Sequence, residues 1–148
     1  MNQIIMAIVG LALAVIGTIA VAPSIFQSTD SATSGAMAQE VASIRSAMTM
    51  HVGTQGLTSF TGVTAGTLAT AGVLKDLAVA DGKFVSKARS GVTYEVAVNA
   101  GSDKVFDITI AGVTGAQEAN LAEKIAKTPG TVTNTVADDG IIIVAYNG

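Results

Sequence analysis

The sequence predicts an α+β fold: a long N-terminal helix, first apolar and then amphipathic, packed on a small head. We expect the head to hold an antiparallel sheet of about four strands and two short helices. Two observations predict this. The first 29 residues contain no Asp, Glu, Lys, Arg or His, and the remainder alternates between helical and strand-like hydrophobic patterns. We therefore divide the chain into an apolar helix over residues 1–26 and a remainder over 27–148, long enough for one moderate core.

The apolar tract has the length of a membrane-spanning helix. As a helix, the stretch from Ile4 to Ala22 would reach across roughly the 30 Å of a bilayer core. Because it is apolar on every side, it requires lipid or other chains like itself around it. We expect a kink or local melting between Gly17 and Pro23, since proline cannot donate its N–H to the helix.

Two simpler interpretations of this tract fit less well. A cleaved signal peptide needs a basic start, which Met1, Asn2 and Gln3 do not provide. A plain single-pass anchor needs Lys or Arg near its ends to set its orientation, and the first basic residue is Arg45. The missing charges are explained if they lay on a leader that has been removed, which would make Met1 a processed end.

An amphipathic helix follows the tract. Met37, Val41, Ile44, Met48 and Val52 recur at helical spacing, while Glu40 and Arg45 lie off this stripe. Glycines at 53 and 56 end the pattern. We expect Met37, Val41, Ile44 and Met48 to pack against the head and the other side of the helix to face solvent or neighbouring subunits.

The middle of the chain has weaker signals. Residues 53–63 are predicted to form a loop, and 64–72 a short helix with Gly72 beyond its end. Residues 73–79 continue apolar, and Asp81-Gly82 indicates a turn. Residues 92–98 and 105–110 alternate between apolar and polar side chains, so we expect them to form a β-hairpin.

The C-terminal third predicts a helix and two strands. Thr114 precedes a helix over about 115–127, with Gln117 at the capping-box spacing. Residues 131–136 form a Thr/Val strand, and Asp139-Gly140 turns the chain into IIIVAY over 141–146. The unbroken apolar run predicts a central strand covered on both faces.

The sequence offers no catalytic or metal-binding constellation. With no cysteine and one histidine, His51, it lacks a disulfide, a thiolate zinc site and a multi-histidine site. A net charge of −3 argues against nucleic-acid binding, and no phosphate-binding glycine motif is present. We therefore expect no enzyme activity, cofactor or metal. We interpret the remaining charged residues and methionines as structural: Asp138 and Asp139 lie in a turn, Asp103 and Asp107 on a solvated face, and His51 at the surface. Met37, Met48 and Met50 are expected to be packing residues. Lys83, Lys87 and Arg89 are expected on a solvated face, and the alternative for these three is a contact with another subunit or with a polyanion.

Several segments, taken in order, resemble class b type IV pilins, in particular the toxin-coregulated and bundle-forming pilins. They are AQEVASIRSAMTMHV over 38–52, residues 64–72, FDITIAGVTGAQEANLAEKI over 106–125, and the closing VAYNG over 144–148. The resemblance covers nearly the whole chain. It implies the type IV pilin fold and a structural subunit, a major pilin, that polymerises through its apolar helix into an extracellular helical filament.

The resemblance also implies partners and places. The chain would be held in the bacterial inner membrane before assembly, contact a prepilin peptidase and the pilus assembly machinery, and then form an open homo-oligomer on the cell surface. Met1 would be the site of N-terminal processing and methylation. The residues expected to pack in the filament core are Ile4, Ile5, Met6, Ala7, Gly10, Ala14, Gly17 and Pro23.

The sequence departs from the family at two positions. Ile5 stands where pilins normally carry a glutamate that neutralises the N-terminal amine of a neighbour, so Asn2 and Gln3 become the expected partners of that amine. Glu118 stands where class b pilins begin a disulfide. A minor pilin or secretion pseudopilin, or a membrane-anchored surface binding module, remains the alternative. The role of the filament stays open between adhesion, conjugation, motility, DNA uptake and phage reception, as do contacts with phage, host surfaces or DNA.

Overall fold

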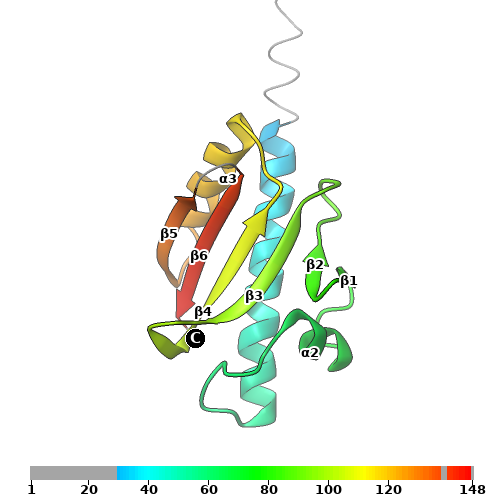
Figure 1. Ribbon diagram of the computed structural model, residues 1–148, viewed down its shortest axis with the longest axis vertical. Coiled ribbons are helices and arrows are strands. Elements are labelled where there is room, and N and C mark those ends of the chain that lie inside the picture. The colour runs from blue at the N-terminus through cyan, green and yellow to red at the C-terminus, as the bar shows by residue number, and fades with distance from the viewer. Residues whose placement is uncertain (1–29, 138–139, 148) are drawn as a thin grey trace, which may run out of the picture. The chain divides into compact units, whose positions relative to one another are not determined.

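A layer of helices covers one face of an antiparallel sheet in the computed structural model of the protein (Figure 1). The structure describes residues 30–137 and 140–147, and the unit Thr33–Gly148 is described here by itself. Residues 30–55 are helical and are called the first helix below. The predicted apolar tract and the boundary after residue 26 lie outside the described residues. Within the described part of the chain, no helix combines the length and apolarity needed to cross a membrane.

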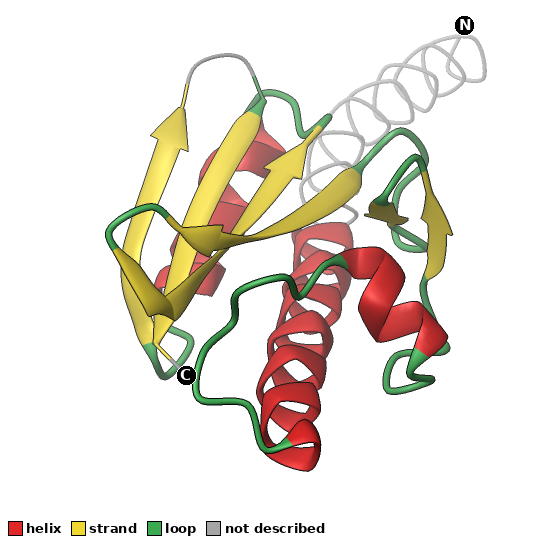
Figure 2. Ribbon diagram, turned by 60° about the horizontal axis from the view of Figure 1, so that its bottom comes forward, coloured by secondary structure: helices red, strands yellow, loops and turns green. Residues whose placement is uncertain are grey.

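Six strands form the sheet, in the order β1-β2-β3-β4-β6-β5, and every neighbouring pair is antiparallel. Two short helices complete the unit (Figure 2). The α+β class is therefore confirmed. The bounds are α2 Ala65–Thr70, β1 Ala78–Ala80, β2 Lys83–Val85, β3 Thr93–Asn99, β4 Ser102–Ala111, α3 Ala116–Ala126, β5 Thr131–Ala137 and β6 Ile141–Asn147.

The expectation of about four strands was wrong, because β1 and β2 add a short hairpin. The turn between them was predicted correctly: Asp81 and Gly82 both have positive φ, at 50° and 75°, as a tight two-residue turn requires. The strands themselves have three residues each, and all of β1 is exposed. Three residues are too few to show the alternation of apolar and polar side chains that identifies a strand, so the sequence did not distinguish these strands from a loop.

Strand β6 is interior, as predicted, since it pairs with β4 on one side and with β5 on the other. Its side chains alternate, however. Ile142, Val144 and Tyr146 are fully buried on the helix-covered face, whereas Ile141 on the other face is 36% exposed. The prediction that this strand is covered on both faces was therefore wrong at its start, because the first helix and α3 lie on the same side of the sheet (Figure 2).

Helix α3 begins differently from the prediction. Its N-cap is Gly115, with φ 56° and no side-chain hydrogen bond, so Thr114 and Gln117 do not form a capping box. Gln117 is instead buried and accepts a hydrogen bond from the Arg89 guanidinium. The expected helix over 64–72 is present as α2, where Thr64 and Thr67 form a reciprocal capping box and Gly72 follows the end with φ 68°.

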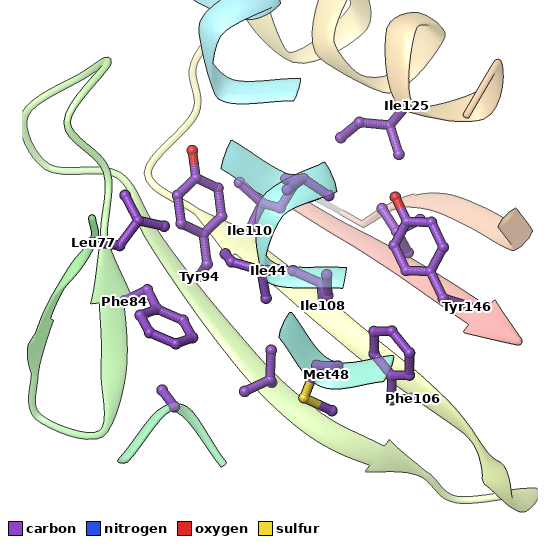
Figure 3. Packing of buried hydrophobic residues seen from close by; sticks show 14 of the residues in the cluster. Ile44, Met48, Leu77, Phe84, Tyr94, Phe106, Ile108, Ile110, Ile125 and Tyr146 are labelled. Carbon is purple, nitrogen blue, oxygen red and sulfur yellow. The ribbon is translucent and has the colours of Figure 1, made fainter. Parts of the chain in front are cut away.

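The core lies between the sheet and the helices. Aromatic side chains fill much of it: Phe106 packs against Phe60 and Tyr146, with ring centroids 4.7 and 5.7 Å apart. Figure 3 shows Ile44 and Met48 of the first helix next to Ile108 and Phe106 of β4. One continuous cluster thus joins the first helix, the sheet and α3.

Candidate functional site

The first helix presents its apolar stripe to the sheet. Met37, Val41, Ile44 and Met48 are at most 1% exposed and belong to the core cluster, which Val52 joins as a partly buried neighbour. Burying one such side chain stabilises a fold by about 1.5–3 kcal/mol. The sequence predicted that these four residues pack the helix against the head, and this is confirmed. We therefore take the first helix and its contacts with the sheet as the candidate functional site.

A second attachment is polar and was not predicted. The Glu40 carboxylate accepts four hydrogen bonds, at 2.6 Å from the Ser86 hydroxyl, 2.8 Å from the Lys87 amide, 3.0 Å from the Ala88 amide and 2.6 Å from the Tyr94 hydroxyl. These five residues are called the Glu40 cluster. It connects the first helix to β3 and to the segment between β2 and β3, which carries three of the donors.

Tyr94 is the most buried donor of the Glu40 cluster. Its side chain is fully buried in the core, and its hydroxyl lies 3.3 Å from the Ser86 hydroxyl as well as against Glu40. Burial, and then the hydrogen bond to the Glu40 carboxylate, hold the pKa of Tyr94 well above its ordinary value. The hydroxyl therefore stays protonated and remains a donor over the whole physiological pH range.

The segment from β2 to β3 is fixed in turn by a close backbone approach. Gly112, with φ 87°, lies where a side-chain Cβ would collide with the Gly91 carbonyl oxygen. The Ser86 amide donates to the Val92 carbonyl oxygen at 3.0 Å, which closes the segment on itself. The positions of Ser86, Lys87 and Ala88 are thus fixed by the backbone of their own segment as well as by Glu40.

Arg45 provides another polar attachment. Its guanidinium donates to the Pro129 carbonyl oxygen and lies 5.2 Å from the centre of the Tyr146 ring, a cation–π geometry. Glu40 and Arg45 were expected to stand away from the packed stripe. Both instead contact the rest of the unit, so neither charge of residues 33–54 is left on the outer side of the helix.

The three basic residues expected to cluster have different partners. Lys83 pairs with Glu95 at 2.8 Å, Arg89 donates to the buried Gln117, and Lys87 contributes its backbone amide to the Glu40 cluster. Asp103 is exposed as expected, whereas Asp107 accepts from the Asn99 side-chain amide at 2.8 Å. Lys87 is exposed and the Lys83 side chain is 41% exposed, in agreement with the predicted solvated face, whereas Arg89 is half-buried against Gln117.

Other predicted positions have mixed outcomes. His51 is half-buried, and its Nδ1 has no hydrogen-bond partner among the described residues; it lines a groove of about 620 Å³ beside α2. Glu118 lies in the first turn of α3. Asp138 and Asp139 lie outside the described residues, as do the predicted filament-core and N-terminal positions: Met1, Asn2, Gln3, Ile4, Ile5, Met6, Ala7, Gly10, Ala14, Gly17 and Pro23.

The described residues bring together no cluster of metal ligands. Across residues 30–137 and 140–147, no three His, Cys, Asp or Glu side chains come together as metal ligands would. Glu40 already accepts four hydrogen bonds and is one of the residues that line a hollow of about 370 Å³. No family model, no curated protein and no solved structure matches the chain.

Proposed function

We propose that the chain is the major structural subunit of a type IV pilus. It polymerises through its apolar N-terminal helix into an extracellular helical filament, after storage in the bacterial inner membrane and processing at Met1 by a prepilin peptidase. It has the type IV pilin fold and no enzymatic role. One observation carries the proposal: an amphipathic helix directly follows an uncharged tract of sequence. This helix is attached along one side by the buried stripe from Met37 to Met48 and by the charged side chains of Glu40 and Arg45.

The outer side of the same helix supports the proposal. Its exposed side chains between residues 33 and 54 are uncharged, and most of them are small. The Ser43 and Thr49 hydroxyls donate to the Gln39 and Arg45 carbonyl oxygens of the preceding turn, which satisfies them within the helix. A surface helix of a monomeric protein normally carries charges on its solvent side. Small, internally satisfied side chains suit a helix with close neighbours.

A minor pilin or secretion pseudopilin is the second candidate. Ile5, in place of the glutamate that pairs with a neighbour's amine, is the observation that favours it. Subunit stoichiometry separates the two: a major pilin makes up nearly all of the fibre, whereas a minor one is a trace component.

Imaging of sheared cell-surface material tests the proposal. We expect helical fibres composed of this chain, and detergent-soluble monomers without fibres would contradict the filament function and favour a membrane-anchored binding module. Gly10→Leu should block fibre formation while leaving membrane insertion intact, because a larger side chain keeps neighbouring helices apart. Leu11→Ile, which conserves side-chain volume in the same tract, is the matched control and should assemble normally.

A further inference from the structure

A groove of about 620 Å³ lies between the C-terminal end of the first helix and the side of α2. Both ribbon views place α2 beside that end of the first helix (Figures 1 and 2). The volume falls within the range of about 300–1,000 Å³ that is usual for small-molecule sites. No Asp, Glu, Lys or Arg lines the groove. Its larger lining residues are His51, Gln55, Leu57, Thr64, Thr67 and Thr70.

The α2 wall of the groove carries three threonines at a spacing of three residues, which places Thr64, Thr67 and Thr70 on one side of the helix. The Thr67 hydroxyl donates to the Thr64 carbonyl oxygen at 2.9 Å and accepts from the Thr64 amide at 2.8 Å. The Thr70 hydroxyl donates to the Gly66 carbonyl oxygen at 2.9 Å. Both hydroxyl oxygens therefore keep a lone pair for a ligand.

The Thr64 hydroxyl has the opposite role. Its oxygen accepts from the Thr67 amide at 3.3 Å, and its proton has no acceptor among the described residues. The α2 wall thus offers one donor and two acceptors, and the reciprocal bonds of Thr64 and Thr67 fix their direction. These groups lie along the flank of α2 as far as Thr70, so the groove is not formed by the end of the helix.

The other wall comes from the first helix and the loop after it. His51 and Gln55 are four residues apart and therefore lie on the same side of the helix. The His51 Nδ1 is enclosed without a hydrogen-bond partner in the described part of the chain, so Nε2 is the ring nitrogen left to meet a ligand. The exposed Gln55 amide adds a donor and an acceptor. Leu57, 45% exposed, adds apolar surface.

We propose that this groove binds a neutral saccharide. A sugar hydroxyl both donates and accepts, which matches a wall with one free hydroxyl proton and two threonine lone pairs. The C–H face of a sugar ring suits the apolar surface of Leu57. A charged ligand fits less well, because it would lose hydration without meeting an opposite charge. A purely apolar ligand would leave the polar groups of both walls unpaired.

The inference goes beyond the proposed filament function and does not depend on it, since all lining residues belong to one described unit. The saccharide can be a free sugar or the end of a glycan chain, because both present the same hydroxyls. The experiment therefore includes both forms.

An NMR titration of the isotope-labelled full chain in detergent tests the site, with glucose, galactose and N-acetylglucosamine as probes. We expect saturable shifts with at least one sugar, confined to the amides of residues 51–57 and 64–71. Thr70→Val and Gln55→Ala, both at exposed positions, should each weaken binding about fivefold, the effect of losing one hydrogen bond. Thr49→Val is the matched control: its hydroxyl also bonds to a carbonyl four residues earlier, but it does not line the groove.

Each outcome decides the site. Shifts in the groove that weaken in Thr70→Val and Gln55→Ala, but not in Thr49→Val, support it. No saturable shift with any of the three sugars, equal affinity in every variant, or shifts only with the charged N-acetylneuraminic acid would overturn it. Capture of the chain by immobilised glycans that end in the bound sugar identifies a glycan end, and binding of the free form alone identifies a free sugar; both retain the site. None of these measurements requires fibres, so the result is independent of the filament proposal.

Discussion

Glu40 and Arg45 are five positions apart on the first helix, and they attach it to the rest of the unit in different ways. Glu40 accepts from two hydroxyls and two backbone amides, among them the fully buried Tyr94. Arg45 meets one carbonyl oxygen and the face of one ring. The four donors around Glu40 hold its carboxylate in one position. Arg45 has a single hydrogen-bond acceptor, so another side chain can replace its guanidinium at a smaller cost. The two charged side chains are therefore unequal attachments on either side of the apolar stripe.

The largest effect is expected from the stripe that lies between them. Ile44→Ala should lower the free energy of unfolding by about 2–5 kcal/mol, because it removes a fully buried side chain and leaves a cavity. Urea unfolding of the full chain in detergent measures it. Ser46→Ala, on the exposed side of the same helix turn, should change the value by less than about 0.5 kcal/mol. Equal losses in the two variants would contradict the packing described above.

Removing the carboxylate should come next. Glu40→Ala leaves the Tyr94 and Ser86 hydroxyls without their acceptor, which should cost about 2–3 kcal/mol. In a double-mutant cycle, Glu40→Ala and Tyr94→Phe should be non-additive by about 1 kcal/mol, since they remove the same hydrogen bond. Gln39→Ala, exposed and adjacent, is the control. Additive losses would show that the two residues are not coupled.

The arginine should matter less. Arg45→Lys keeps the charge but loses the planar contact with the Tyr146 ring, so we expect a loss of about 0.5–1 kcal/mol. The same urea titration measures it. A loss as large as that of Glu40→Ala would remove the asymmetry between the two attachments.

The smallest expected effect is a change of stability with pH at the alkaline end, and it comes from Tyr94. Because its pKa in the folded chain lies above the ordinary 10.0, the folded state keeps a proton that the unfolded state releases. The contribution is therefore fully present below about pH 10 and is lost as the pH rises beyond it. Urea midpoints measured between pH 8 and 11 should fall at the alkaline end, and less so in Tyr94→Phe. The remaining fall is expected from Tyr146, whose pKa burial also raises.

The parts of the fold with long periodic patterns were predictable from sequence. The stripe from Met37 to Met48, the hairpin of β3 and β4 and the interior position of β6 all follow from regular spacing of apolar residues. Strands β1 and β2 are too short to show a period. The capping box predicted at the start of α3 was wrong for another reason. The Gln117 side chain accepts a hydrogen bond from Arg89, a residue distant in sequence, instead of bonding near Thr114.

The Glu40 cluster lay beyond sequence reasoning for the same reason. Its donors come from residues 86–94, and two of them are backbone amides whose direction depends on how the segment folds. One signal was available. Glu40 is the only acidic residue between Asp30 and Asp76, and a lone carboxylate on a helix otherwise bordered by small polar residues points to a specific partner.

The position of the Glu40 cluster near the N-terminal end of the compact unit also has a mechanical consequence. Tension applied along the first helix from its N-terminal side would reach the sheet through Met37 and Glu40 before it reaches Arg45. Sliding the helix along the sheet would strain all four hydrogen bonds of Glu40 at once, instead of opening them one after another. A fibre made of such subunits would resist stretching by shear between helix and head, and the Glu40 cluster would carry that load as one unit.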